Sequence, residues 1–398
     1  MPVKQKKPGL PDTKATWEKR VKKLGIWPAS VHTAKPLTRA SEIKEKEFYR
    51  LHVLWKHSPI PKFDWTLAGL AEWKNEAKIL LRGYKCWQEY CNSLQTKEIC
   101  ESTFALALAF QRQAAGIDTN ITRPDVEAGP PRYPTRQARK PRITPMDMLT
   151  ERTGRLNIQA SSAKEEGADD EDVFLSTPVR IREQQFNDTP ISLDSPGDPE
   201  LRRTIYPPTK DEQIVNTALL NFLTALTIHM KLSVQWSLHR VPLHADFNTA
   251  SYEARTDGYL ESIEESEKDK KIRALIEVKA ALREIKRNKI RMQESAQTVA
   301  WLKSHPDTGG LLNTRGRRIH VSQDRHEIWV IIADYDDSYL RYLEGEDDPD
   351  AFMTMQEYGP WFTDNLNHMR HLAPILVAIA LRAEADLKEE KKKAKKSE

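Results

Sequence analysis

The stretch that decides the fold begins at Tyr252-Glu253-Ala254-Arg255-Thr256-Asp257-Gly258-Tyr259 and continues to Ile276-Glu277-Val278-Lys279. Both segments have the apolar alternation of a β-strand, and the first carries a carboxylate, Asp257, directly before a glycine. In the second, strand periodicity places Glu277 and Lys279 on one face, about 7 Å apart along the strand. Neighbouring strands are therefore expected to bring two acids and an amine together.

A helix is predicted after these strands, at Asn288–Lys303, because its apolar residues return to helical spacing. Gln293, Gln297 and Trp301 recur every four residues and so lie on one stripe of that helix. The two amides are expected to face the same site as the strand residues, although surface-exposed glutamines are an equally good interpretation of the spacing.

Two carboxylates on adjacent strands suit Mg²⁺, which takes one or two carboxylates and keeps several waters. Such an ion neutralises a phosphodiester oxygen and lowers the pKa of a bound water toward neutrality. A lysine beside it can stabilise the negative charge that develops in the transition state. The residue types therefore indicate metal-dependent phosphodiester hydrolysis.

The elements around this stretch alternate between helix and strand, which predicts a mixed α/β fold. A helix is expected at Asp211–Met230. The predicted strands and the last helix are Val234–Leu243, Tyr252–Ile263, Ile272–Ala280, a hairpin of Arg318–Val321 and Glu327–Tyr335 turning at Ser322–Arg325, and a helix from Pro374 toward Lys388.

The order helix, three strands, helix, strand resembles the restriction-endonuclease-like core (αβββαβ) of PD-(D/E)XK nucleases, as found in fungal PD-(D/E)XK nuclease-like proteins. The resemblance covers about half of the chain, and its characteristic phrases are Asp211–Asn216, Glu253–Tyr259, Glu277–Lys279 and Met292–Gln297. It implies a Mg²⁺- or Mn²⁺-dependent endonuclease acting on DNA, with RNA as an alternative substrate.

The resemblance also implies roles for individual residues. Asp257 and Glu277 would ligate the metal, with the Val278 carbonyl and Glu212 as further ligands. The residues implied in catalysis are Asp257, Glu277, Lys279, Gln293 and Gln297.

Two positions depart from the family pattern. Thr256 stands where the eponymous proline would be, a common replacement, and Trp301 replaces a tyrosine, which removes a hydroxyl. The bland alternatives are a turn aspartate, a solvent-facing Glu277–Lys279 pair and a Glu212 that only begins its helix. His368 and His371 have metal-ligand spacing, but exposed or core histidines are the favoured interpretation.

The remaining chain divides by composition. Residues 1–120 hold six of the ten tryptophans at mostly helical spacing and predict a packed helical region whose protein partner, if any, the sequence does not name. Residues 121–204 hold clustered prolines and no tryptophan, and predict a disordered linker. The nuclease-like domain is expected at 205–388, followed by a basic tail at 389–398.

Whole-chain properties set the class. Hydrophobic residues make up 39% of the 398 residues, and the net charge of +4 is too small to indicate a nucleic-acid partner by itself. Cys86, Cys91 and Cys100 fit no zinc or disulfide pattern and predict reduced thiols. Without a signal peptide or a spanning apolar run, we expect an intracellular protein with no membrane partner, whose lysine-rich tail is either a nuclear-import signal or a solvated helix end.

Two other functions remain open at this point. In the first, the domain keeps the fold without catalysis and binds nucleic acid or a protein partner, since fold does not fix function. Alternatively, the main function lies in an N-terminal scaffold.

Overall fold

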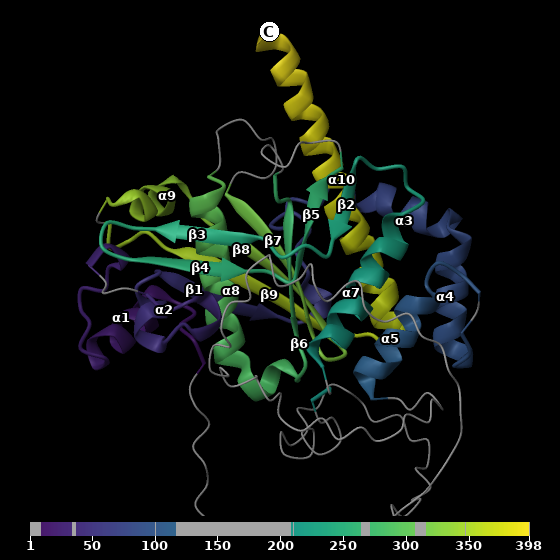
Figure 1. Cartoon of the computed structure of the whole chain (residues 1–398), viewed down its shortest axis with the longest axis horizontal. Coiled ribbons are helices and arrows are strands. Elements are labelled where there is room, and N and C mark those ends of the chain that lie inside the picture. Colours follow the sequence, from purple (N-terminus) through teal and green to yellow (C-terminus); the bar gives the residue numbers. More distant parts are fainter. Residues whose placement is uncertain are drawn as a thin grey trace, which may run out of the picture. The chain divides into compact units, whose positions relative to one another are not determined.

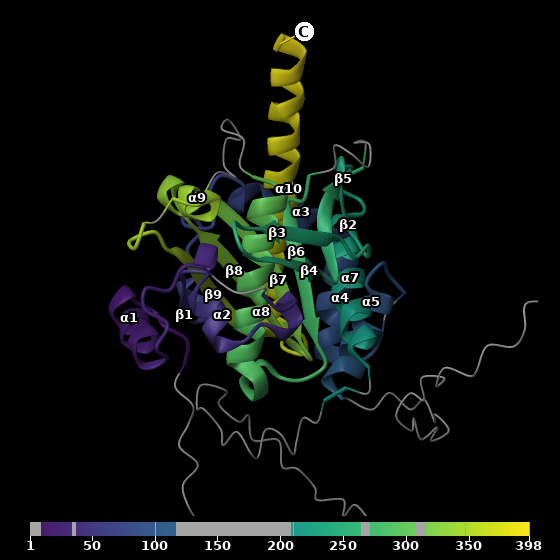
Figure 2. The same cartoon turned by 60° about the vertical axis from the view of Figure 1, so that its left-hand side comes forward.

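The computed structural model describes residues 9–33, 37–99, 101–116, 208–209, 211–263, 271–306, 316–346 and 348–397. The predicted linker 121–204 and Cys100 lie outside these residues. The fold is mixed α/β, as predicted, and is built on a seven-stranded sheet with strand order β1-β9-β8-β7-β6-β5-β2 (Figures 1 and 2).

The strands of this sheet pair in both directions. β2 and β5 are antiparallel, as are β5 and β6, whereas β6 pairs parallel with β7 and β1 pairs parallel with β9. Their bounds are β1 Val53–Ser58, β2 Val234–Ser237, β5 Gly258–Ser262, β6 Ala274–Lys279, β7 Arg317–Asp324, β8 Glu327–Asp334 and β9 Met353–Phe362. A separate hairpin consists of β3 Pro242–Asp246 and β4 Ser251–Arg255.

Helices cover both faces of the sheet. On one face, α7 (Glu212–Thr227) and α10 (Leu366–Ser397) pack together with α3 (Lys74–Gly83), α4 (Lys85–Thr96) and α5 (Ala105–Ala115). On the other face lie α8 (Arg283–Ser304), α2 (Glu45–Tyr49) and the β3–β4 hairpin. The helices α1 (Lys14–Lys23) and α9 (Asp337–Glu344) border this second core.

The alternation predicted for β6 is confirmed. Ala274, Ile276 and Val278 belong to the core under α7 and α10, whereas Leu275 belongs to the core under α8. Because side chains alternate along a strand, Glu277 follows Leu275 onto the α8 face.

The prediction that residues 1–120 are helical is wrong at one strand. Val53–Ser58 forms β1 and pairs with β9, because the β-branched and aromatic run Val53-Leu54-Trp55 gains a strand partner only in the tertiary structure. Residues 1–120 and 196–398 form one compact unit, so the described part of the N-terminal region belongs to the same fold as the predicted nuclease-like domain.

Two predicted strands are each divided. Val234–Leu243 splits into β2 and β3, and Tyr252–Ile263 splits into β4 and β5. The second break falls at Thr256-Asp257, where the chain leaves the hairpin for the main sheet. Gly258 permits a close approach there, since a Cβ at this residue would lie 2.6 Å from the Ser237 carbonyl oxygen.

The predicted hairpin turn at Ser322–Arg325 is displaced. β7 continues to Asp324 and the turn is at Arg325-His326, with Arg325 at φ 58°. The polar residues that suggested a turn are buried instead, and the Ser322 hydroxyl donates to Glu294 at 2.6 Å.

The two C-terminal helices begin earlier than predicted. α8 begins at Arg283, and a non-helical Lys286 (φ −129°, ψ 26°) interrupts its first turns. Residues on either side of this break do not share one helical spacing, so the spacing predicts only the later turns. α10 begins at Leu366, where the Asn365 side chain accepts the His368 N–H at 3.1 Å, and Pro374 lies inside it. Its C-terminal turns, which hold the lysine-rich tail, extend past the strands (Figure 1). β9 and α9 were not predicted.

Candidate functional site

The predicted site residues converge where β5, β6, α7 and α8 meet. We call Glu212, Asp257, Glu277 and Lys279 the acid–lysine cluster. Asp257 precedes β5 and its Oδ2 accepts the backbone N–H of Val278 at 3.1 Å, while its own N–H donates to the Ile276 carbonyl at 3.1 Å. These two bonds fix the Asp257 carboxylate against β6.

The Lys279 ammonium lies among three oxygen acceptors. It contacts a Glu277 carboxylate oxygen, the Val278 carbonyl oxygen at 2.9 Å and Glu212 Oε1 at 3.1 Å. Glu212 stands in the first turn of α7 and its side chain is 46% exposed, so this end of the cluster is open to solvent. Asp211, not Glu212, caps the helix by accepting the Gln213 N–H.

Glu277 is the buried end of the same cluster, with a side chain only 3% exposed. Gln293 Nε2 donates to Glu277 Oε1, and Gln297 Nε2 donates to Oε2 at 2.5 Å and to the Arg255 carbonyl at 2.8 Å. The predicted stripe of α8 therefore holds both oxygens of this carboxylate. Trp301, the third residue of the stripe, is buried in the core, where the Arg318 guanidinium stacks over its ring.

Burial and charge act in opposite directions on this pair. Burial, together with the nearby Asp257, raises the pKa of Glu277 to about 8, against the attraction of the Lys279 ammonium. For Lys279, burial alone would lower the pKa, but Glu277 and Glu212 more than offset it and the pKa is raised. The lysine therefore stays charged, whereas Glu277 is a carboxyl group that can hold a proton near neutral pH.

Two residues that the sequence analysis did not single out support Asp257. The Asn216 side chain on α7 donates to the Asp257 carbonyl at 3.2 Å, and an Arg240 guanidinium nitrogen lies 3.3 Å from Asp257 Oδ1. Arg240 is 62% exposed and stands on the solvent side of the site. Their sequence separation from Asp257 carries no periodic signal, so only the fold reveals them.

A second group of charges was also missed. We call Arg283, Arg291, Glu294, Asp324 and Glu357 the arginine cluster. The Arg283 guanidinium contacts three carboxylates: it donates to Asp324, to Glu294 at 2.5 and 3.0 Å, and to Glu357 at 2.8 Å. Arg291 makes two bonds to Glu357, at 2.6 and 3.1 Å.

Four members of the arginine cluster, Arg283, Glu294, Asp324 and Glu357, are inaccessible to solvent, whereas the Arg291 side chain is 8% exposed. The side chains of Arg283, Glu294 and Glu357 are each 0% exposed. Burial raises the pKa of Asp324 to about 6, although Arg283 draws it the other way. For Glu357 burial also acts upward, but Arg283, His57 and Arg291 hold its pKa well below the ordinary range. We interpret this cluster as a buried structural network.

The histidines considered as metal ligands make other contacts. His368 Nδ1 accepts the Phe362 N–H at 3.1 Å, and His371 Nδ1 accepts the Trp361 indole N–H at 3.2 Å. Asp336 caps α9. Within the described ranges, no group of three His, Cys, Asp or Glu residues is arranged to hold a metal. The predicted metal ligands Asp257, Glu277, Glu212 and the Val278 carbonyl all lie at the acid–lysine cluster, the last three in contact with the Lys279 ammonium.

Scans of the chain against protein-family models, and searches among curated proteins and solved structures, find no match. Among the residues that the structure describes, no helix is long and apolar enough to cross a membrane. The chemistry of the site is therefore inferred from its own residues.

Proposed function

We propose that this chain is a Mg²⁺- or Mn²⁺-dependent nuclease that hydrolyses phosphodiester bonds of DNA through a PD-(D/E)XK-type site. The observation that carries the proposal is the convergence of Asp257, Glu277 and Lys279 on the α8 side of the sheet, with Lys279 bonded to Glu277 and Asp257 bonded to the backbone of β6.

The arrangement of the neighbouring elements supports it. α7 precedes the antiparallel strands β2, β5 and β6, and α8 leads from β6 to the parallel strand β7. This order, with the β3–β4 hairpin inserted between β2 and β5, is consistent with the proposed restriction-endonuclease-like core, which requires a helix, three strands, a helix and a strand. Asp257 directly precedes β5, the second strand of this order. Glu277 and Lys279 lie on β6, the third.

The donor set fits a small hard cation. Two carboxylates and one backbone carbonyl are oxygen ligands of the type that Mg²⁺ takes while keeping several waters. The Lys279 ammonium lies against two of these groups, Glu277 and the Val278 carbonyl, so both already accept a cationic partner. A bound divalent ion would supply an activated water and neutralise a phosphate oxygen.

The protein groups have separate tasks in this proposal. Lys279 holds a positive charge where the phosphate acquires negative charge in the transition state. Gln293 and Gln297 fix the rotamer of Glu277, so that its oxygens do not reorient during the reaction. Arg240, on the exposed side of Asp257, is placed to contact the phosphate of an arriving strand.

Plasmid cleavage tests the proposal directly. Supercoiled DNA is incubated with the full chain and Mg²⁺ or Mn²⁺, beside Asp257→Asn, Lys279→Ala and the exposed control Lys289→Ala. The proposal is supported if the nicking rate falls by at least about 10²-fold in both site variants and is unchanged in the control. Nicking that survives in Asp257→Asn and Lys279→Ala would refute it. An RNA of the same sequence serves as the alternative substrate.

A second candidate is a non-catalytic module that binds nucleic acid or a protein partner. It is favoured by the state of Glu277, whose oxygens are both occupied by Lys279 and the two glutamines, and whose raised pKa makes it a weaker metal ligand. Calorimetry with Mn²⁺ separates the candidates, because a catalytic site must take up metal and lose this binding in Glu277→Gln.

A further inference from the structure

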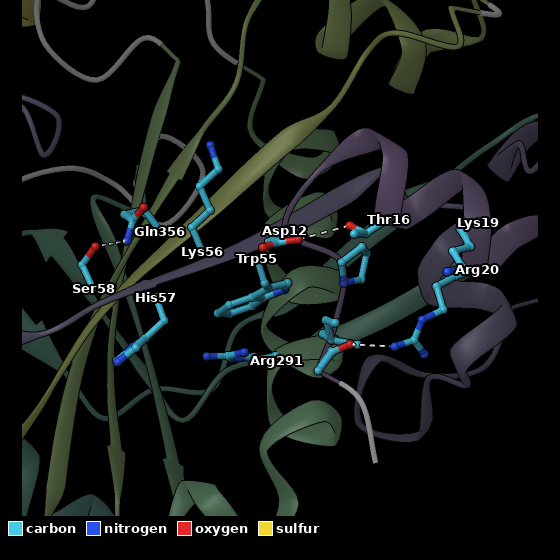
Figure 3. Close-up of a pocket in the computed structure, with 13 residues that line it drawn as sticks. Asp12, Thr16, Lys19, Arg20, Trp55, Lys56, His57, Ser58, Arg291 and Gln356 are labelled. Atoms are coloured by element: carbon cyan, nitrogen blue, oxygen red, sulfur yellow. Dashed lines mark hydrogen bonds between the residues drawn. The ribbon is translucent and has the colours of Figure 1, made fainter. Parts of the chain in front are cut away.

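A groove far from the acid–lysine cluster lies between α1 and β1, with a volume of about 740 Å³. Its lining includes Asp12, Lys19, Arg20, Trp55, Lys56 and Arg291 (Figure 3). We propose that this α1–β1 groove binds phosphate ester groups, either of a nucleic-acid strand or of a free nucleotide.

The charge of the lining is one-sided. The lining includes four cationic side chains, Lys19, Arg20, Lys56 and Arg291, and one acid, Asp12. The Asp12 carboxylate accepts the Thr16 hydroxyl at 3.2 Å. A concave surface lined mainly by positive charge attracts anions more strongly than the same charges on a flat surface, because the low-dielectric walls focus the field.

Two of these cations are available to a ligand. Lys19 on α1 and Lys56 on β1 are exposed, and neither forms an ion pair with any residue of the described ranges. Arg20 donates to the Gly9 carbonyl at 3.3 Å, and its guanidinium is 4.0 Å from Glu45. An anion in the groove would therefore meet lysine ammonium groups whose charge is not already neutralised.

The floor of the groove is rigid. The Arg291 guanidinium stacks 5.2 Å from the centre of the Trp55 ring and makes two bonds to Glu357. Trp55 is itself fixed, since its indole N–H donates to Ser295 at 2.8 Å. His57 Nδ1 lies 3.2 Å from the same Glu357 carboxylate. The side chains around a bound anion are thus largely held in place before it arrives.

The lining favours recognition of phosphate over recognition of a base. Trp55 is 2% exposed and covered by Arg291, so it offers no free face on which a base could stack. Among the other polar groups, the Ser58 hydroxyl accepts the Gln356 amide at 3.2 Å and can donate its own proton to a phosphate oxygen. We therefore expect binding that depends on charge and not on sequence.

The position of the groove relates it to the proposed nuclease site. β1 and β6 are separated by β9, β8 and β7 in the sheet, which is about 19 Å at the usual strand spacing. That distance corresponds to roughly six nucleotides of one duplex strand. A nucleic-acid strand as the source of the phosphate rests on the proposed function, whereas binding of a phosphate ester does not.

Fluorescence anisotropy with a labelled single-stranded oligonucleotide, in EDTA to prevent cleavage, tests the groove. Lys19→Glu/Lys56→Glu reverses both free lysines, and Lys78→Glu/Lys85→Glu makes the same change of charge at exposed lysines of α3 and α4, on the other face of the sheet. We expect about tenfold weaker binding for the first variant only, and a salt dependence shallower by about 1.4 in log–log slope.

Competition identifies the source of the phosphate. Displacement by millimolar adenosine monophosphate as well as by unlabelled oligonucleotide indicates a nucleotide-sized phosphate site, and displacement by oligonucleotide alone indicates a strand. Equal losses in the two double variants, or no loss in either, would overturn the proposal. If charge reversal disturbs folding, Lys19→Gln/Lys56→Gln replaces it. This variant should have an unchanged thermal transition and must also bind the oligonucleotide more weakly than the parent.

The same measurements keep this proposal separate from the catalytic one. If the chain binds the oligonucleotide in EDTA through Lys19 and Lys56 but does not cleave plasmid, the groove proposal stands and the nuclease proposal is refuted. If the parent chain cleaves plasmid and Lys19→Glu/Lys56→Glu binds the oligonucleotide as tightly as the parent does, the nuclease proposal stands and the groove proposal is refuted.

Discussion

Glu277 of the acid–lysine cluster and the arginine cluster both contact α8. Gln293 and Gln297 of this helix donate to Glu277, and the helix supplies Arg283, Arg291 and Glu294 to the arginine cluster. The two clusters differ in access to solvent. Lys279 is 23% and Glu212 46% exposed, whereas Arg283, Glu294 and Glu357 have no exposed side-chain surface. The first can exchange its internal partners for a ligand, whereas Arg283 and the carboxylates around it cannot without unfolding.

The two clusters also differ in how their charges are satisfied. In the arginine cluster, Arg283 alone contacts three carboxylates. In the acid–lysine cluster, the buried carboxyl group of Glu277 can instead take up a proton, since its pKa is raised to about 8. Loss of one cation should therefore be severe in the arginine cluster and mild in the other. Burial of charge alone does not identify a functional site in this fold.

The largest expected effect is on stability. Arg283→Met leaves Asp324, Glu294 and Glu357 in the core without their shared cation, and should lower the free energy of unfolding by about 3–5 kcal/mol. Urea denaturation measures it, with the exposed Arg240→Met as control. A loss below about 1 kcal/mol would show that the network is not structural.

The next largest effect is a loss of activity with little change in stability. Glu277→Gln keeps the side chain's shape but removes a metal-ligating charge, so plasmid cleavage should fall by about 10²–10³-fold. Its free energy of unfolding should stay within about 1 kcal/mol, because no buried carboxylate remains to be desolvated. The control is Glu253→Gln, on β4, whose side chain is 31% exposed. Parallel losses of stability and activity would instead mean that Glu277 has a structural role, as the arginine cluster does.

A smaller effect concerns the competition between lysine and metal. Lys279→Met removes the ammonium that occupies Glu277 and the Val278 carbonyl, and should raise the affinity for Mn²⁺ about tenfold while cleavage falls. Calorimetry compares it with Lys289→Met on the exposed face of α8. Unchanged or weaker Mn²⁺ binding would contradict the idea that both cations use the same oxygens.

The smallest effect is a dependence of stability on pH at the buried His320, next to the arginine cluster. Burial and the nearby Arg283 lower the pKa of His320 to about 3, and Thr298 lies 2.8 Å from its Nε2. Below the unfolded pKa of about 6.5, the unfolded chain binds a proton that the folded chain does not. Stability contributed by this residue is therefore lost as the pH falls from about 6.5 toward 3.

His320→Gln tests this sign. Between pH 6 and pH 5 the parent should lose about 1 kcal/mol more unfolding free energy than the variant, measured by urea denaturation at each pH. Equal losses would mean that His320 can take up a proton in the folded chain.

The sequence by itself determined the local features of the site. Strand alternation placed Glu277 on the face opposite Ile276 and Val278, and four-residue spacing placed Gln293 and Gln297 on one stripe of α8; both depend only on the geometry of a single element. The same local signals gave the mixed α/β class and the helix that begins at Glu212.

Tertiary structure alone decided the rest. β1 became a strand because β9 offered it a partner, and β9 has a weak strand signal because Glu357 and Gly359-Pro360 interrupt its apolar pattern. The arginine cluster joins residues up to 74 positions apart, and Lys19 and Lys56 line one groove although they belong to different elements. Contacts between distant elements leave no periodic trace in a sequence, because they depend on how the faces pack and not on the spacing along either one.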